Sequence, residues 1–407
     1  MKSIETPEQK QTIPKMYIWQ TFLFEDAPNF RQERGISRTL LVSLGSQEFG
    51  GLETHVLNLY KQLSTLSHRP LLLVAARSLL HRRAVEERLS FYAVRWSRCR
   101  GFRHLLPFVF NELCKRHPIH IIHCNNRFEV RSAVRAATHC SAKVILNYHV
   151  PTQFDTGVLE GVDAFISPGP DIVGYVRESV RANRRAIQHI QVIPPLFDAE
   201  KFLGYRSDVE PAKWFADTFG IAVRPCPILC TIGNMVTDLE HKNYPLLLQA
   251  MALLIHDKET PVQAMLAGDG PIRPYLQELA KNLGIQDYVH FLGYTHLTPG
   301  VLHHSDIFVL ASSREAFGIV YLEAGLMRKP AIGARNTGAE IAIVPEETGL
   351  LFDNGSASSL ADAIRRLVQD PGLAHTLGGR GYERVTRHFV PSAVIKQYDK
   401  LYTVLAS

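Results

Sequence analysis

The sequence lacks the signatures of several large protein classes. Its six cysteines are scattered and none stands in a Cys-x-x-Cys pair, which argues against a disulfide framework and a structural zinc site. The longest uncharged apolar run near the start, residues 16–24, is about half the ~20 residues that cross a bilayer, and no secretory signal is apparent. From these absences we expect a cytoplasmic protein whose residues 1–35 form a poorly ordered extension.

Motifs for common cofactors are missing as well. The chain has no Gly-x-Gly-x-x-Gly, which leaves little support for NAD binding, and no Walker-type Gly-x-x-x-x-Gly-Lys-Ser/Thr. It also has no Asp-x-Asp, so a metal-bridged diphosphate would lack its usual acidic anchor. We therefore expect neither a metal ion nor a cofactor.

The composition is that of an ordinary globular protein, with 46% hydrophobic and 21% charged residues, and 407 residues predict two or three domains. The net charge of +6 is uneven, because residues 69–143 hold fifteen Lys or Arg against four acids. Such a block fits anionic lipid headgroups or a phosphorylated acceptor better than nucleic acid, and a solvated surface is the simpler alternative. The candidate lipid contacts are Arg77, Arg82, Arg83, Arg95, Arg98, Arg100 and Arg103.

From residue 38 onward, short β-rich runs alternate with helix-length amphipathic segments. The expected strands are 40–44, 71–75, 119–123, 144–149, 165–167, 227–233, 262–267, 289–292 and 307–310, and the expected helices include 52–66, 128–140, 171–185 and 390–405. This alternation is typical of right-handed βαβ units, so the predicted fold class is α/β with two Rossmann-like doubly wound domains.

Domain boundaries follow from breaks in the alternation. Pro194 and Pro195 stop strand pairing, so we place a first domain at 36–205, a second domain at 206–388 and a C-terminal helix at 389–407. Two such domains in tandem form a cleft between the carboxyl ends of their strands, where these sheets bind ligands.

The most informative motif is Glu315-Ala-Phe-Gly318-Ile-Val-Tyr-Leu-Glu323, directly after the apolar run 307–310. A buried strand ends there, a turn containing glycine follows, and a helix begins whose free N–H groups favour an anionic ligand. The two carboxylates would be ~12 Å apart on a helix, which is too far for the acid and base of a glycosidase. We expect them to bind different parts of one long ligand.

Two further turns are candidates for the same ligand. Gly50-Gly51 opens the first helix and allows close backbone approach, although a tight strand-to-helix turn is an equally good interpretation. Gly233-Asn234 and Lys242 flank the entry to the first helix of the second domain, where an ammonium would neutralise a departing diphosphate. The alternative for Lys242 is a solvated surface lysine.

His123 and His149 end two strand candidates and would both face the cleft, but a strand-end histidine is more often a structural residue. Asp269 in Ala267-Gly-Asp-Gly270 is interpreted as part of a strand-to-helix turn.

Taken together, these motifs resemble the retaining family-four glycosyltransferases of the GT-B fold over roughly residues 38–405. The resemblance rests on Gly50-Gly51, Val192-Ile193-Pro194, Asp198, Phe202, Gly233, Lys242, Ala267-Gly268-Asp269-Gly270-Pro271, Phe291-Leu292-Gly293, Ser312, Glu315, Glu323-Ala324 and Thr348-Gly349. It implies that the second domain binds a nucleotide-diphosphate sugar, that the first binds the acceptor, and that the last helix crosses back to the first domain.

The resemblance also implies roles for individual residues. Glu323 would bind the ribose and Glu315 the donor sugar, with His123 contacting the transferred sugar and Lys242 compensating the diphosphate, so His123, Lys242 and Glu315 are the catalytic candidates. The remaining donor contacts would come from Gly50, Gly51, Asn234, Phe317, Gly318 and Ile319. His149 and Arg127 are the candidates for acceptor binding.

One departure from the family pattern concerns the leaving group. The family commonly has Arg where this chain has Asn234, so one cationic contact is lost unless a residue such as Arg127 replaces it. The resemblance implies transfer of a hexose from a UDP- or GDP-sugar to a glycan or lipid-linked acceptor, in cell-surface polysaccharide or glycolipid synthesis at the inner face of the membrane. A catalytically inert binding protein and a nucleotide-sugar epimerase stay open as alternatives.

Overall fold

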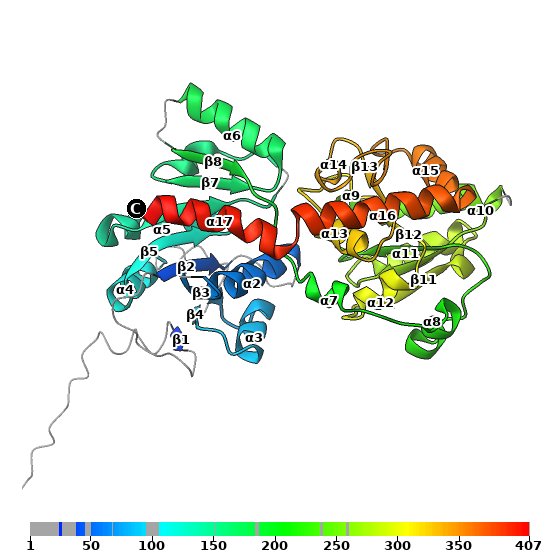
Figure 1. The fold of residues 1–407 in the computed structure, drawn as a ribbon, viewed down its shortest axis with the longest axis horizontal. Helices are drawn as coiled ribbons and strands as arrows, with labels where there is room; N and C mark the ends of the chain where they lie inside the picture. The colour runs from blue at the N-terminus through cyan, green and yellow to red at the C-terminus, as the bar shows by residue number, and fades with distance from the viewer. Residues whose placement is uncertain are drawn as a thin grey trace, which may run out of the picture.

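The chain folds into two α/β domains that lie side by side (Figure 1). The computed structural model describes residues 24–26, 38–44, 50–66, 68–94, 106–150, 152–183, 187–236, 239–257 and 260–406. Within these residues the first domain contains a sheet in the order β1-β4-β3-β2-β5-β6-β7-β8, and the second a sheet in the order β11-β10-β9-β12-β13-β14.

In the first sheet, every pairing is parallel except that of β1 with β4. Its strands are β1 Phe24–Asp26, β2 Arg38–Ser43, β3 Arg69–Ala75, β4 Phe91–Val94, β5 Ile119–Cys124, β6 Lys143–Asn147, β7 Ala164–Ser167 and β8 His189–Val192. The helices are α2 Gly51–Ser64, α3 Leu79–Glu86, α4 Leu106–Arg116, α5 Arg127–Cys140 and α6 Pro170–Ala182, with the short 3-10 helix η2 Thr156–Leu159.

The central strand β2 shows why this sheet forms where it does. All six of its residues are buried, as expected for a parallel strand that is covered by helices on both faces. Leu40 and Val42 pack toward α4, α5 and α6, whereas Leu41 packs toward α2 and α3. The sheet is therefore a middle layer, and its carboxyl end carries the loops that face the second domain.

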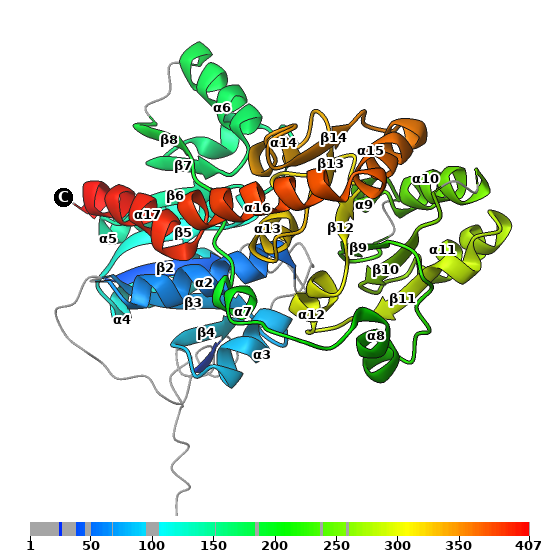
Figure 2. The same cartoon turned by 45° about the vertical axis from the view of Figure 1, so that its right-hand side comes forward.

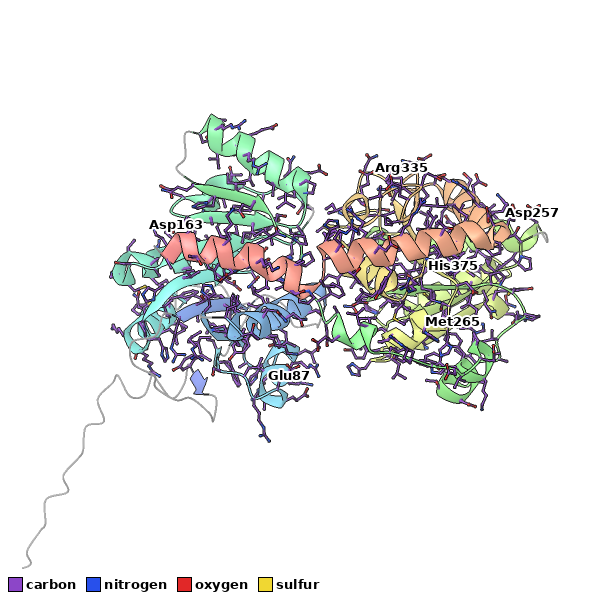
Figure 3. All side chains as sticks on the ribbon, viewed as in Figure 1. Glu87, Asp163, Asp257, Met265, Arg335 and His375 are labelled. Carbon is purple, nitrogen blue, oxygen red and sulfur yellow. The ribbon has the colours of Figure 1, made fainter. Side chains whose placement is uncertain are left out.

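The second sheet is parallel throughout its described strands. They are β9 Ile228–Ile232, β10 Gln263–Ala267, β11 Val289–Gly293, β12 Ile307–Leu310, β13 Ala331–Ala334 and β14 Gly349–Phe352. The helices are α8 Pro211–Phe219, α9 Leu239–Lys242, α10 Tyr244–His256, α11 Arg273–Asn282, α12 Thr298–His303, α13 Ile319–Leu326, α14 Ala339–Ala342, α15 Ala357–Gln369 and α16 Pro371–His388, with the 3-10 helix η3 Gln286–Tyr288. Met265 of β10 lies inside this domain, far from Glu87 in the first (Figure 3).

Two segments connect the domains. The first runs from Pro194 through α7 Glu200–Leu203 to α8. The second is the junction at Phe389, after which α17 Pro391–Ala406 leaves the second domain and lies along the first (Figure 1). This is the arrangement that the resemblance implies for the last helix.

An apolar stripe attaches α17 to the first domain. Its buried residues recur every three or four positions and pack with α2 and β5 in one core cluster. Full burial of one such side chain is worth about 1.5–3 kcal/mol, so the helix is an integral part of the first domain. The stripe consists of Val394, Ile395, Tyr398, Leu401, Tyr402 and Leu405.

The predicted strands and helices of both domains are present, and the α/β prediction with two doubly wound domains is confirmed. The sequence pattern did not predict β1, which falls in the expected extension, nor β4, β8, β13 and β14. Each of these is three or four residues long, a length at which periodicity gives little signal; β7 and β12 are equally short but were predicted.

The described cysteines are free thiols, in keeping with the predicted lack of a disulfide framework: Cys114, Cys124, Cys140, Cys226 and Cys230. Among the described segments, no helix is both long and apolar enough to cross a membrane.

Candidate functional site

The loop after β9 packs closely against two glycines of the turn between β10 and α11. Gly268 and Gly270 have φ of 151° and 155°, and a Cβ there would lie 1.9 Å from the Gly233 oxygen and 2.2 Å from the Met235 oxygen. The Tyr244 hydroxyl donates to the Gly233 carbonyl at 2.5 Å. Because only glycine permits this approach, the turn fixes the position of residues 233–235.

Asn234 lies half-buried within this supported loop, at the position where the resemblance leads one to expect an arginine. Asp269 accepts the Gly270 N–H at 2.8 Å and pairs with Arg273 at 3.1 Å. These contacts confirm the interpretation of Asp269 as a turn residue.

Lys242 and Glu315 come together as an ion pair. The Lys242 Nζ lies 2.7 Å from the Glu315 Oε2, and the two side chains are 18% and 11% exposed. Beside them the Asn243 amide donates to the Ser313 hydroxyl at 2.8 Å, with Asn243 in the left-handed region at φ 46°. The loop before α10 and the loop before α13 are therefore joined, which places the ammonium beside the predicted diphosphate site.

The loop of residues 315–318 enters α13 through a left-handed glycine. Gly318 has φ 81° and forms the N-cap of α13, as the motif predicted. The Gly338 N–H donates to the Glu315 carbonyl at 2.7 Å, and a Cβ at Gly338 would lie 2.3 Å from Ala316. A second turn thus packs against this loop and fixes the position of the free N–H groups at the start of α13.

Phe317 anchors the same loop to the junction between α16 and α17. Its ring packs edge-on against Phe389 at 5.7 Å between centroids, and both side chains are buried. Arg384 covers the other side of Phe389 at 5.3 Å and donates to the Ile341 carbonyl at 2.9 Å. The loop of residues 315–318 is therefore in direct contact with the segment where the chain changes domain.

Glu323 lies one turn into α13 and is half-buried. Burial raises the pKa of this carboxyl to about 7, while the positive charge of Lys201 opposes the rise and the negative charge of Asp198 adds to it. Glu323 is therefore only partly ionised near pH 7, which bears on any role as a hydrogen-bond acceptor.

The Gly50-Gly51 turn of the first domain contacts the start of α13 in the second domain. Gly50 caps α2 and its N–H donates to the Glu53 carboxylate at 2.9 Å. A Cβ at Gly51 would lie 3.6 Å from the Ile319 Cδ1. The predicted donor contacts Gly51 and Ile319 are thus adjacent in space although they belong to different domains.

Gly169 is a second point of approach, which the sequence did not indicate as functional. It caps α6 in the first domain, and a Cβ there would lie 3.6 Å from the Ala316 carbonyl oxygen. The sequence feature that could have indicated a functional turn is the position of Gly169 between Pro168 and Pro170, immediately after β7. Both first-domain glycines therefore lie against the loop that leads into α13.

His123 lies in the core of the first domain. It is fully buried, and its Nδ1 shares a 2.5 Å hydrogen bond with the Tyr402 hydroxyl of α17. Burial lowers the pKa of His123 to about 3 and that of His149 to about 4, so both rings are neutral near pH 7. Within the described residues, neither Nε2 has a hydrogen-bond partner. Contact of His123 with a sugar stays a prediction.

The loop between β5 and α5 carries the other first-domain candidates. Arg127 is half-buried, with its guanidinium 5.2 Å from the centre of the Phe128 ring. Sequence reasoning missed two buried neighbours, Asn125 and Glu129. The Glu129 carboxyl accepts the Leu44 N–H at 2.7 Å, and burial raises the pKa of Glu129 to about 8. It thereby ties the end of β2 to the start of α5.

No group of three or more His, Cys, Asp or Glu side chains with an arrangement suited to a metal ion occurs among the described residues. Of the candidate lipid contacts, Arg95, Arg98, Arg100 and Arg103 lie outside the described residues, whereas Arg77, Arg82 and Arg83 are exposed on or beside α3.

Comparison with known families assigns both halves of the chain. Residues 227–384 match the sequence model of the group 1 glycosyl transferases, and residues 49–201 match that of glycosyltransferase family 4. The second-domain match covers β9 to β14, and the first-domain match covers β3 to β8. Together they include the ion pair, α13 and the Gly50-Gly51 turn.

Curated relatives match over part of their length. An N-acetyl-alpha-D-glucosaminyl L-malate synthase of Bacillus anthracis is 35% identical over 154 residues, 38% of this chain and 40% of the relative. The lipopolysaccharide core biosynthesis glycosyltransferase LpsE of Rhizobium meliloti is 33% identical over 175 residues, 43% of this chain and 49% of the relative. The matched stretches thus span less than half of each relative.

Solved structures agree over nearly the whole fold. A glycosyltransferase from Rickettsia africae superposes with a TM-score of 0.78 at 19% identity, covering 91% of this chain and 98% of that one. The Anabaena HepE protein in complex with UDP gives 0.75 at 18% identity, covering 91% and 100%. With both halves matched and the two-sheet architecture shared, this chain belongs to the family-four glycosyltransferases of the GT-B fold.

Proposed function

We propose that this chain is a retaining, metal-independent glycosyltransferase that moves a hexose from a UDP- or GDP-sugar to a glycan or lipid-linked acceptor. The observation that carries the proposal is the ion pair of Lys242 and Glu315 beside the N-terminus of α13, opposite Gly51 of the first domain. This arrangement puts an ammonium, free backbone N–H groups and a carboxylate close to the contact between the two domains.

The donor lies along α13 in this proposal. Glu323 accepts the ribose hydroxyls, and the N–H groups after Phe317 receive the diphosphate, because a helix N-terminus favours negative charge. Glu315 accepts hydroxyls of the sugar. Lys242 then shares its charge between Glu315 and the diphosphate, and its attraction to the diphosphate grows as the glycosidic bond breaks.

The reaction proceeds on one face of the sugar. The acceptor hydroxyl approaches the anomeric carbon from the side on which the diphosphate departs, and a departing phosphate oxygen takes its proton. The anomeric configuration is thereby retained. No side chain serves as the base in this proposal, which agrees with the pKa of His123: burial lowers it to about 3 and makes the imidazole a weak proton acceptor.

The first domain supplies the acceptor site, with His149 and Arg127 as candidate contacts. The matched relatives support a saccharide-modifying role, because their names describe attachment of N-acetylglucosamine to malate and synthesis of a lipopolysaccharide core. Arg77 and Arg82 would bring this domain to an anionic membrane surface, where lipid-linked acceptors are found. The transfer reaction would then be a step in the synthesis of a cell-surface polysaccharide or glycolipid.

The test begins with thermal unfolding in the presence of UDP- and GDP-hexoses, because a ligand at 100 times its Kd adds about 2.7 kcal/mol. The best donor is then incubated with candidate acceptors, and the product linkage is read by NMR. We expect nucleotide release that depends on acceptor and an unchanged anomeric configuration. An inverted product contradicts the mechanism. Release of an altered sugar without acceptor indicates an epimerase, and binding without any product indicates an inert protein.

A further inference from the structure

The segment between α9 and α10 is attached to the loop before α13 at two points. One is the ion pair of Lys242 and Glu315, with 2.7 Å between Nζ and Oε2. The other is the hydrogen bond that the Asn243 amide donates to the Ser313 hydroxyl at 2.8 Å. The two donors are neighbours in the chain and their partners are only two positions apart, so both contacts act on one short stretch. Figures 1 and 2 both show α13, into which this loop leads, on the side of the second domain that faces the first.

Asn243 has an unusual conformation for a residue at the start of a helix. It is the N-cap of α10 with φ 46° and ψ 45°, in the left-handed region, whereas an N-cap residue normally has an extended backbone and accepts an N–H of its own helix. The Asn243 side chain makes no such capping bond and binds Ser313 instead. Glycine adopts the left-handed region without strain. What asparagine adds over glycine at this position is therefore the amide that binds Ser313.

Ser313 is also fixed from a second loop. The amide of Asn354, which follows β14, donates to the Ser313 carbonyl at 2.9 Å. In the parallel sheet only β13 separates β12 from β14, so the loops that follow these two strands leave the sheet at the same edge. Ser313 thus has its hydroxyl bound to Asn243 and its carbonyl bound to Asn354. The bond from Asn243 therefore ends on a residue that is itself fixed in place.

The Lys242 side chain is confined along its length as well. A Cβ on Gly233 would lie 3.5 Å from the Lys242 Cε and 3.6 Å from its Cδ, so the stem of the lysine packs against the backbone of the loop after β9. The Tyr244 hydroxyl fixes that loop through its bond to the Gly233 carbonyl. A lysine side chain is flexible, so its ammonium keeps one position only where the surroundings restrict it. Here the stem is restricted by Gly233 and the adjoining backbone by Asn243.

We propose that Asn243 is a positioning residue that acts through Lys242: its side-chain hydrogen bond to Ser313 fixes the backbone beside the lysine and so holds the ammonium where the diphosphate departs. The inference rests on the proposed function, because the departing diphosphate is what the ammonium stabilises. It adds that turnover depends on a bond between two uncharged side chains. Asn234, in the neighbouring loop, supplies no positive charge, which makes the position of the Lys242 ammonium more important.

The expected effect is a loss of turnover with little loss of donor binding. Asn243→Gly removes the amide and keeps the left-handed backbone free of strain. Misplacement of a catalytic group by about 1 Å can cost about 100-fold in rate, and loss of the charge itself about 10²–10³-fold. We expect kcat to fall about 3- to 30-fold, which is less than in Lys242→Met, while the donor Kd stays within about twofold. Ser313→Ala removes the acceptor of the same bond, so it should have the same effect, and the double variant should be no worse than either single one.

The experiment measures donor Kd and the rate of nucleotide release from UDP-glucose or GDP-mannose, whichever the wild type binds, with the acceptor that gives the fastest release. The variants are Asn243→Gly and Ser313→Ala, alone, together and each combined with Lys242→Met. Asn336→Gly is the matched control, because Asn336 also has a left-handed backbone, with φ 57°, and is exposed in the loop after β13. Lys281→Met, an exposed lysine on α11, is the control for Lys242→Met.

A second measurement does not depend on turnover. Urea unfolding of the wild type, Lys242→Met, Glu315→Gln and the double variant gives the coupling free energy between these two side chains. In the Asn243→Gly background this coupling should be weaker, because the ammonium is no longer held against the carboxylate. A coupling of unchanged size overturns the inference.

The remaining outcomes separate the roles of these residues. A fall in kcat in Asn243→Gly and Ser313→Ala that disappears in the Lys242→Met background supports the inference. An unchanged kcat, a loss of equal size in the Lys242→Met background, or weaker donor binding with unchanged kcat overturns it. If the wild-type protein releases no nucleotide from either nucleotide-sugar, that result contradicts the proposed function, and the coupling measurement still decides whether Asn243 positions Lys242.

Discussion

At the residue scale, Lys242 has two possible counter-charges. In the structure its ammonium pairs with Glu315 at 2.7 Å, in surroundings where both side chains are largely buried. Removal of one partner from such a pair leaves the other charge without compensation, so a substitution here affects more than one contact. The same ammonium lies beside the loop that leads into α13, whose free N–H groups the proposed function assigns to the diphosphate.

Replacement of Lys242 with Met should lower kcat more than donor affinity. Negative charge on the diphosphate increases as the bond breaks, so the interaction is stronger in the transition state than with bound donor. Loss of a group of this kind typically lowers kcat about 10²–10³-fold. The measurement is steady-state turnover together with Kd for the donor, with Lys281→Met as a control.

Asn234→Arg is the companion variant. Because Asn234 lies in the supported loop next to this site, an arginine there should leave activity equal or raised. Full turnover in Lys242→Met, or a strong loss in Asn234→Arg, would show that the leaving group is stabilised elsewhere.

At the element scale, α17 depends on polar contacts as well as its apolar stripe. Tyr402→Phe should reduce the free energy of unfolding by about 0.5–3 kcal/mol, because the His123 Nδ1 stays buried without its partner. Urea unfolding measures the change. Tyr275→Phe on α11, where the side chain is 48% exposed, should change stability by less than about 0.5 kcal/mol. Equal effects of the two variants would show that the buried hydrogen bond adds nothing.

The histidines beneath α17 predict a sensitivity to acid. Burial holds the pKa of His123 at about 3 and that of His149 at about 4, whereas an imidazole in the unfolded chain titrates near 6.5. Between pH 6.5 and 4 the unfolded state therefore binds more protons than the folded state. The free energy of unfolding then falls as the pH falls, by about 1.4 kcal/mol per pH unit for each imidazole. Replacing His123 with Gln should make the pH dependence of unfolding shallower, as urea midpoints at pH 7 and 5 would reveal.

Some parts of the candidate site could be predicted from the sequence and others could not. The start of α13 was predictable, because Gly318 marks the turn and Glu315 and Glu323 flank it in one continuous segment. The ion-pair partner of Glu315 was not predictable, because Lys242 lies 73 positions away in the sequence. The two side chains meet only because the fold brings their loops together. The burial of His123 was likewise hidden, because the helix that covers it comes 279 positions later at Tyr402.

At the scale of the whole molecule, activity should survive EDTA. The sequence has no Asp-x-Asp, and no metal-type cluster of acids, cysteines or histidines occurs in the described part of the chain. In the proposed mechanism the charge of the diphosphate is compensated by Lys242 and by N–H groups instead. Turnover with and without EDTA is the measurement, and a loss that Mg²⁺ reverses would contradict the prediction.

The first domain should bind vesicles through α3. Arg77 and Arg82 are exposed there, and each well-placed cation near an anionic surface is worth about 1 kcal/mol. Combined Arg77→Gln and Arg82→Gln should therefore weaken flotation with anionic vesicles by roughly 30-fold at low salt. Arg181→Gln is the matched control, because α6 lies at the opposite end of the domain from α3 (Figure 1).

Salt and lipid charge separate this mode of binding from others. Electrostatic attraction should fade as the Debye length shrinks from ~10 Å at 0.1 M to ~3 Å at 1 M salt. Flotation with neutral vesicles, or flotation that ignores salt, would contradict the role of these arginines and favour a water-soluble acceptor.

The attachment of α17 has a consequence for the order of events at the ribosome. The sheet of the first domain is complete in sequence at Val192, yet the helix that closes its core begins only at Pro391. Translation of the roughly 200 intervening residues takes about 10–40 s at 5–20 residues per second. When translation reaches Pro391, the sheet of the second domain is complete in sequence, because β14 ends at Phe352, whereas the surface that will receive Tyr398 and Tyr402 still lacks its helix. The domain made first is therefore the one finished last.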